Sequence, residues 1–220
     1  RVPGSKKSLL QAKADGADVR MVYSPLDALG IARAHPHREV VFFGLGFETT
    51  MPSTALTVLQ AKKEGIANFS LFCNHITIVP TIKAILDSPE LTLDGFLGPG
   101  HVSMVIGTAP YEFIASRYGK PLVVAGFEPL DLLQATWMVM KQLAEGRCEV
   151  ENQYQRVVPS RGNEAALTAV QEVFELREFF EWRGLGSIDH SGVRIREDYA
   201  AFDAERARRR GQAGGRRGQG

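Results

Sequence analysis

Short apolar runs alternate with longer amphipathic stretches along most of this chain. Apolar runs of a few residues predict buried strands, and apolar positions that recur every three or four residues predict helices. Such alternation is typical of repeated βα units that form largely parallel, doubly wound sheets, so the predicted fold class is α/β. Strands are expected at 19–23, 40–43, 69–73, 95–97 and 122–125, and helices near 5–15, 25–34, 52–64, 78–87, 110–118 and 129–145.

The pattern changes near residue 149, where a strand over 150–158 and a helix over 164–175 precede the Gly-rich stretch EWRGLGSIDHSG. The last residues contain only Arg, Gly, Ala and Gln, which cannot bury a core and predict disorder. We therefore expect residues 1–38 to end a first α/β domain, 39–148 to form a central α/β domain, 149–205 to return and pack on the α/β core, and 206–220 to be a disordered tail.

Length and composition place the chain among ordinary globular proteins. Its 220 residues are 44% hydrophobic and 23% charged, which is enough to bury a substantial core. The net charge of +1 hides an asymmetry, because six arginines lie after residue 205 and acidic residues outnumber basic ones in the rest. Since there is no apolar run of membrane-spanning length and no signal-peptide pattern, we expect a cytoplasmic protein without a membrane partner.

Four short polar loops follow predicted strands: GLGFETT at 44–50, CNH at 73–75, GPGHVS at 98–103 and AGFEP at 125–129. Ligands of α/β sheets bind at the carboxyl ends of the strands, so we expect these loops to share one sheet edge and form the functional site. The candidates for chemistry are Glu48, Thr49, Thr50, His101, Ser103 and Glu128. The candidates that line the cleft are Gly46, Phe47, Asn74, His75, Gly100, Gly126, Phe127 and Pro129.

Two carboxylates and two imidazoles near one edge could move protons or orient a metal-bound ligand. Simpler interpretations remain for most of these residues. Threonines and acids at helix starts serve as caps or interact with the helix dipole, the two phenylalanines can anchor the loops, and Cys73 can be a small buried apolar residue. Asn74 and His75 can likewise serve only to hydrogen-bond their own loop.

The sequence argues against a dinucleotide site and against a metal site. GLGFET departs from the dinucleotide fingerprint GxGxxG, because Thr49 replaces the third glycine and Glu48 stands where a pyrophosphate would lie. Cys73 and Cys148 lie far apart without CxxC spacing, which argues against a disulfide framework or a cysteine-only metal site. The remaining candidate ligands match no standard metal motif, so no metal-binding residue is predicted in this chain.

Over about residues 1–205, the motifs resemble, in the correct order, those of the HypD family of [NiFe]-hydrogenase maturation proteins. The resemblance is carried by RVPGSKKSLLQAKADGADVRMVYSPLDAL, VFFGLGFETTMPSTA, GFLGPGHVSMVIG, VVAGFEPLDLLQ, VENQYQRVVPSRGN and EWRGLG. It implies a scaffold that carries an iron together with a HypC-type chaperone while cyanide and carbon monoxide are added. A HypE-type protein supplies the cyanide, and the finished unit passes to the hydrogenase large subunit.

The resemblance also implies where the site lies. Family members carry a [4Fe-4S] cluster and redox-active cysteines, and the motifs that fall on 46–50, 101–103 and 126–129 line the cleft near the iron-carrying cysteine. That cysteine, a GPGCPVC-type thiol motif and the cluster-binding region have no counterpart in this sequence. We therefore expect a truncated or frame-disrupted homologue that binds no cofactor and is inactive by itself, and an assembly scaffold with a redox role rather than an ordinary enzyme.

Two alternatives remain open. The first is a small-molecule metabolic enzyme that uses Glu48, His101 and Glu128 in a sheet-edge cleft to act on a carboxylate or carbonyl substrate. The second is a nucleic-acid-binding module that depends on the Arg/Gly tail. Nucleic acid ranks last among the expected partners, because the polar motifs lie elsewhere.

Overall fold

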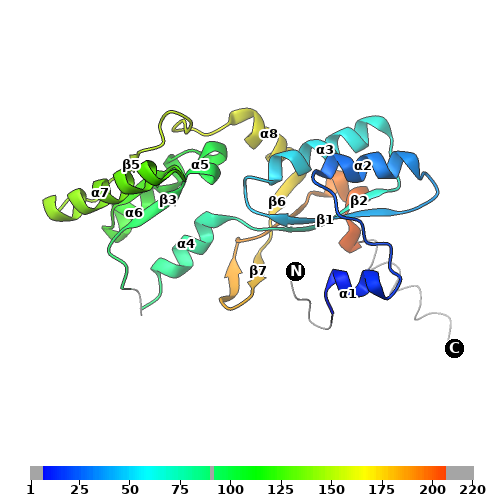
Figure 1. The fold of residues 1–220 in the computed structure, drawn as a ribbon, viewed down its shortest axis with the longest axis horizontal. Helices are drawn as coiled ribbons and strands as arrows, with labels where there is room; N and C mark the ends of the chain where they lie inside the picture. The colour runs from blue at the N-terminus through cyan, green and yellow to red at the C-terminus, as the bar shows by residue number, and fades with distance from the viewer. Residues whose placement is uncertain (1–6, 90–91, 207–220) are drawn as a thin grey trace.

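The computed structural model describes residues 7–89 and 92–206 (Figure 1). Helices alternate with parallel strands, so the predicted α/β fold class is confirmed. The strands form two parallel sheets with separate hydrophobic cores, and the chain passes from one to the other and back. We call residues 25–75 together with 164–206 the first lobe, and residues 78–160 the second lobe.

The first lobe is built on two parallel strands, β1 (Val40–Gly46) and β2 (Phe69–His75), whose last residues Gly46 and His75 lie side by side. The helices α2 (Pro25–Ala34) and α3 (Met51–Glu64) cover one face of this sheet. Along β1, exposed residues alternate with half-buried or buried ones, because only one face of the sheet is covered.

The C-terminal part of the described chain completes the first lobe. Its elements are α8 (Glu164–Val173), β6 (Phe174–Leu176), β9 (Val193–Ile195) and the 3-10 helix η2 (Glu197–Phe202). β6 and β9 pair in antiparallel fashion, and β9 lies beside β2. Side chains such as Leu29, Leu71 and Ile195 are almost fully buried between these elements. The core of this lobe therefore joins segments that are more than a hundred residues apart.

The second lobe contains a three-stranded parallel sheet of β3 (Phe96–Pro99), β4 (Leu122–Ala125) and β5 (Val150–Asn152), with β4 in the centre. All four residues of β4 are buried, which explains its continuous apolar sequence LVVA. The helical segments of this lobe are α4 (Ile78–Leu86), α5 (Gly100–Ile106), the 3-10 helix η1 (Ala109–Tyr111), α6 (Glu112–Tyr118) and α7 (Pro129–Glu145).

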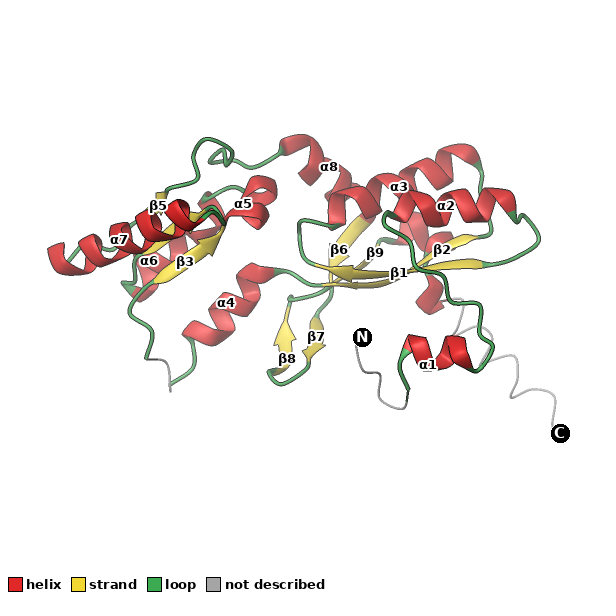
Figure 2. Ribbon diagram, in the orientation of Figure 1, coloured by secondary structure: helices red, strands yellow, loops and turns green. Residues whose placement is uncertain are grey.

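Two smaller features, a helix before the first lobe and a hairpin within its C-terminal segment, extend away from the two parallel sheets (Figure 2). The short helix α1 (Leu9–Ala14) begins with a capping box in which the side chains of Ser8 and Gln11 each accept a backbone N–H. The hairpin of β7 (Phe179–Trp182) and β8 (Gly186–Asp189) extends beside α4. A cavity of about 520 Å³ lies between α4, Phe113 and residues 187–190.

Three details of the predicted fold are wrong. Residues 19–23 form no strand, and within the described chain no strand pairs with them. The strand predicted over 150–158 ends at Asn152, because the next residues turn and the amides of Val157 and Val158 donate to the carbonyl of Tyr154. The single sheet expected to carry all four loops is replaced by two sheets.

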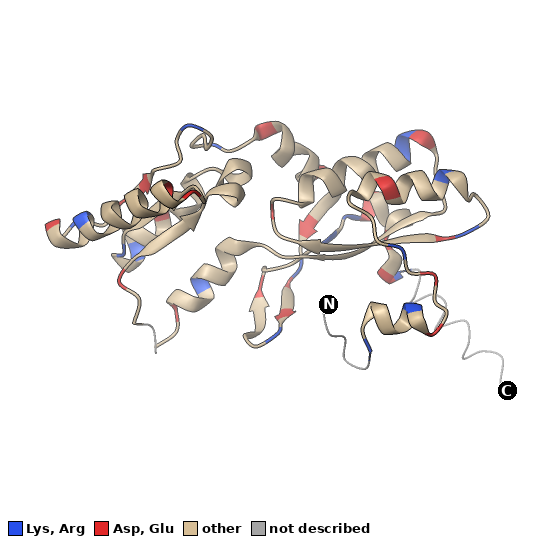
Figure 3. Ribbon diagram, viewed as in Figure 1, with Lys and Arg blue, Asp and Glu red and all other residues tan. Residues whose placement is uncertain are grey.

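Acidic and basic positions are interspersed over both lobes (Figure 3). Across residues 7–89 and 92–206, no helix combines the length and the apolar character that crossing a bilayer requires. The predicted disordered tail lies outside the described residues, apart from Arg206.

Candidate functional site

The four polar loops are divided between the two lobes. GLGFETT and CNH end β1 and β2, whereas GPGHVS and AGFEP end β3 and β4. Parallel pairing places the loops of each sheet side by side. The arrowheads of β1 and β3 point toward the opposite lobe (Figure 2). The motifs therefore lie at the carboxyl ends of two sheets, one pair in each lobe, rather than at one shared edge.

Glu48 lies where the lobes meet. Its Oε1 accepts a hydrogen bond of 2.8 Å from the backbone N–H of Ile78, the first residue of α4. Thr77 at the N-cap provides no side-chain cap, so the carboxylate of Glu48 caps this helix from the first lobe. Glu48 is 7% exposed, and its Oε2 has no hydrogen-bond partner among the described residues. Burial raises the pKa of Glu48, and the hydrogen bond from Ile78 partly opposes that shift.

The other residues of GLGFETT shape this loop. Thr50 occupies the N-cap of α3, but its hydroxyl donates to the carbonyl of Phe47 at 3.1 Å instead of capping the helix. Gly46 has a φ of +155°, and a Cβ there would lie 2.2 Å from Thr50 Oγ1, so the loop requires glycine. Phe47 packs near Trp182 of the hairpin, and Thr49 is exposed.

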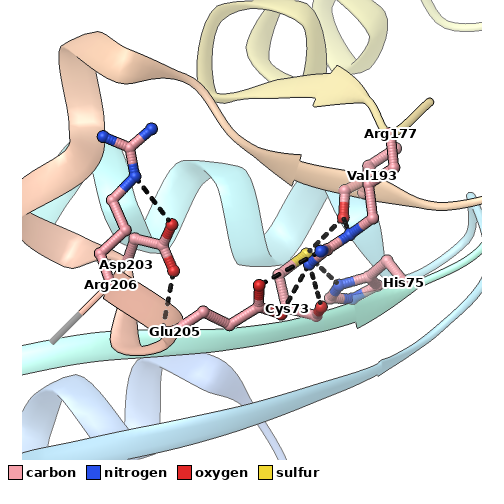
Figure 4. Close-up of polar contacts among 7 residues, drawn as sticks. All are labelled: Cys73, His75, Arg177, Val193, Asp203, Glu205 and Arg206. Carbon is pink, nitrogen blue, oxygen red and sulfur yellow. Dashed lines mark hydrogen bonds and ion pairs between the residues drawn. The ribbon is translucent and has the colours of Figure 1, made fainter. Parts of the chain in front are cut away.

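The CNH segment, predicted as a loop, forms the end of strand β2 instead. Its Cys73 and His75 point into the first lobe (Figure 4). The Cys73 thiol donates to the carbonyl of Val193 at 3.4 Å and lies 3.7 Å from His75 Nδ1. Burial raises the pKa of Cys73 to about 11 and lowers the pKa of His75 to about 4. Both groups are thus neutral near pH 7 and form no reactive thiolate–imidazolium pair. Asn74, the residue between them in the sequence, is half-buried.

Beside Cys73 and His75, Arg177 forms hydrogen bonds that connect β2 to β9 and to Glu205 (Figure 4). Its guanidinium donates to the carbonyls of Cys73 and Val193 and to both carboxylate oxygens of Glu205. A planar guanidinium can satisfy several acceptors at once, which lysine cannot. Arg177, which is about a hundred residues away in the sequence, therefore holds the CNH segment at the end of β2 in the core.

Ser103 of GPGHVS is also built into a core. Its buried hydroxyl donates to the carbonyl of Pro99 at 2.8 Å and lies 3.3 Å from the Tyr111 hydroxyl. Burial raises the pKa of Tyr111 to about 12, the hydrogen bond with Ser103 opposes this, and the negative charge of Glu48 adds to it. Glu48 in the first lobe thus acts electrostatically on a buried hydroxyl in the second.

His101 and the AGFEP loop provide the accessible part of the site. The ring of His101, which is exposed, lies 4.4 Å from the ring of Phe127, which is 59% exposed. Glu128 stands at the N-cap of α7 without a side-chain cap bond, and Pro129 follows in the first turn. The Glu128 carboxylate is exposed and lies 3.7 Å from Arg156 Nη2. The imidazole of His101 and the carboxylate of Glu128 can therefore transfer protons to or from an incoming ligand, or form hydrogen bonds with it.

Metal donors do not gather at this site. Among the described residues, no three His, Cys, Asp or Glu side chains lie close enough together to hold an ion. The sequence has two cysteines, whereas a [4Fe-4S] cluster takes four thiolates. Cys73 is sealed in the core with a raised pKa. The residues present therefore do not fit as ligands of an iron or a cluster.

Sequence patterns missed two aromatic residues at the site. Tyr111 supports Ser103 from eight residues away, and Trp182 lies beside Phe47 although it is more than a hundred residues distant. The Gly-rich motif EWRGLG predicts a turn around Trp182. A turn pattern does not indicate which loop the tryptophan ring contacts.

The two thiols are expected to react at very different rates. Cys148 is exposed, whereas Cys73 is buried with a pKa of about 11. Iodoacetamide should therefore modify Cys148 in the folded protein and Cys73 only after denaturation, because the thiolate is the reactive form. Mass spectrometry of peptides from folded and urea-denatured samples measures this. Equal labelling of both cysteines in the folded protein would contradict the placement of Cys73.

Substitution of Glu48 tests its role as a cap. Glu48→Gln keeps an oxygen acceptor for Ile78 and removes the charge, whereas Glu48→Ala removes the cap and should lower the free energy of unfolding by about 0.5 to 2 kcal/mol. Because the folded pKa is raised, the wild type should be most stable relative to Glu48→Gln below the ordinary glutamate pKa. It should lose that advantage as pH rises through the raised pKa. Urea denaturation at acidic and mildly alkaline pH measures the difference, and an advantage that grows with pH would refute the assignment.

Comparison with known proteins places the chain among hydrogenase maturation factors. A family model described as "HypD: Hydrogenase formation hypA family" matches residues 1–216, which is longer than the resemblance over about residues 1–205 that the motifs indicate. Hydrogenase maturation factor HypD of Rhodobacter capsulatus is 66% identical over 216 residues, which cover 98% of this chain and 57% of that protein. The factors of the same name from Escherichia coli (strain K12) and Rhizobium leguminosarum bv. viciae are 59% and 58% identical, over 93% and 94% of this chain and 55% of each relative. The chain spans little more than half the length of these relatives, and it belongs to the HypD family of hydrogenase formation proteins.

Proposed function

We propose that this chain forms the two-lobed part of a hydrogenase maturation scaffold on which an Fe(CN)2CO unit is assembled. The observation that carries the proposal is the accessible group of His101, Phe127 and Glu128 at the carboxyl ends of β3 and β4. These residues belong to the motifs that resemble the HypD family, and they include no set of metal ligands. They are suited to act on a metal cargo that a partner or another segment holds.

The side chains suit the handling of diatomic ligands. A cyanide bound to iron keeps negative charge on its nitrogen and accepts hydrogen bonds there. The exposed imidazole of His101 and the hydroxyl of Thr49 are possible donors, and Glu128 can accept a proton. Phe127 beside His101 adds an apolar surface suited to carbon monoxide, which forms weak hydrogen bonds. Glu48, whose buried Oε2 has no hydrogen-bond partner among the described residues, is a second candidate proton acceptor.

The proposed partners follow from the same family. A HypC-type chaperone would share the iron cargo, a HypE-type protein would donate cyanide, and the hydrogenase large subunit would receive the finished unit. These steps would take place in the cytoplasm. A [4Fe-4S] cluster and redox-active cysteines would belong to full-length relatives, because the cysteines of this chain do not fit those roles.

The proposal is tested in a full-length relative, in a strain that lacks its own copy of the gene. The substitution that matches His101→Ala should lower hydrogenase activity at least about tenfold, equivalent to about 1.4 kcal/mol of lost stabilisation. The matched control is His37→Ala, an exposed histidine outside the four loops, which should leave activity within about twofold. Infrared bands of iron-bound cyanide and carbon monoxide on the purified complex report the same step. Full activity and unchanged bands with His101→Ala would contradict the proposal.

A further inference from the structure

A short turn after β5 touches both accessible loops of the second lobe. A Cβ built on Gly100 would meet Tyr154 Cδ1 at 2.9 Å, and one built on Gly126 would meet Tyr154 Cδ2, also at 2.9 Å. The two edges of a single ring therefore rest against the glycines of GPGHVS and AGFEP. The Gly100 Cβ would also lie 2.3 Å from the carbonyl oxygen of Ala125, so the loops themselves are in close contact. The pairing of β3 with β4 brings the loops together, and Tyr154 fills the space against both of them.

A polar network fixes the same turn to the start of α7. Asp131, which is 5% exposed, accepts hydrogen bonds from Arg156 Nη1 at 2.8 Å and Nη2 at 2.6 Å, and from Gln153 Nε2 at 2.8 Å. The backbone N–H of Gly126 donates to Gln153 Oε1 at 3.3 Å. The hydrogen bonds from Arg156 and then Gln153 hold the pKa of Asp131 at about 2. A buried carboxylate that is fully ionised and bidentately bound is a rigid anchor.

Arg156 connects the aromatic and polar parts. Its guanidinium lies 4.5 Å from the centre of the Tyr154 ring, and Nη2 is also 3.7 Å from the exposed Glu128 carboxylate. One side chain thus stacks on the ring between the loops, binds the buried Asp131 and approaches the accessible Glu128. Lysine could form one ion pair here but could neither bind bidentately nor stack as a plane.

We infer that Arg156 is a positioning residue of the site, which holds His101 and Phe127 at their observed separation by locking Tyr154 and Asp131 in place. The inference rests on the proposed function only in treating His101 and Glu128 as site residues. What Arg156 is inferred to control is the position of the Tyr154 ring beneath the two loops. Loss of the bidentate contact should loosen Tyr154, and movement of Tyr154 should change how the His101 ring lies against Phe127.

Nuclear magnetic resonance of this chain tests the geometry directly. The His101 Hε1 resonance, assigned with His101→Ala, senses the ring current of Phe127 at 4.4 Å. Arg156→Lys should move this resonance by more than its line width. Arg161→Lys, an exposed arginine of the same return segment, should leave it in place. Asp131→Asn should move it in the same direction, and the double variant should add little, because the two residues act as a unit. Circular dichroism checks that each variant remains folded.

The outcomes separate this inference from the proposed function. An unchanged His101 resonance in both Arg156→Lys and Asp131→Asn would overturn the inference, whatever the activity. A shifted resonance supports it. In a full-length relative, the match of Arg156→Lys should then lower hydrogenase activity several-fold. A shifted resonance with full activity would leave the positioning role intact and contradict the role of His101 and Glu128 in maturation.

Discussion

The buried carboxylate of Glu48 links the two lobes at the point where the chain first passes between them. It leaves the end of β1 and caps α4, so the first helix of the second lobe begins at a group supplied by the first. The neighbouring backbone reinforces this junction, because the amide of Ile76 donates to Gly46 and that of Thr77 donates to Ser191. The cost is that one buried oxygen of Glu48 has no partner in the part of the chain that the structure describes, and that burial raises the pKa of this carboxyl. The contact joins the end of β1 directly to the start of α4.

The motif residues divide into those that build the site and those that can meet a ligand. Cys73, His75 and Ser103 carry reactive groups, but all three are buried and engaged with their own cores. His101 and Glu128 carry similar chemistry on the accessible side. The proposed function needs only the second group, because the described residues hold no suitable set of metal donors. The loops of the chain would surround a cargo held by other ligands.

Much of the fold could be predicted from the sequence because strand and helix periods are local. The run LVVA predicts β4, and the apolar runs at 40–43 and 69–73 predict where β1 and β2 begin, although these strands continue to Gly46 and His75. The pairing of strands is not local, because it depends on residues far apart in the sequence. The sequence pattern therefore could not show that the strands divide into two parallel sheets, or that residues 19–23 pair with no strand of the described chain. The same limit applies to the site. The loops were identified, but the direction of His75 and the reach of Arg156 depend on contacts that tertiary packing alone creates.

The most direct measurement is hydrogen exchange at the backbone amide of Ile78, followed by nuclear magnetic resonance in the wild type and in Glu48→Ala. An amide at the first position of a helix has no partner within that helix and exchanges freely unless something else binds it. If Glu48 caps α4 across the lobes, this amide is protected in the wild type and loses protection in the variant, while amides inside β4 keep theirs. Free exchange of Ile78 in the wild type, or equal protection in both proteins, would contradict the account.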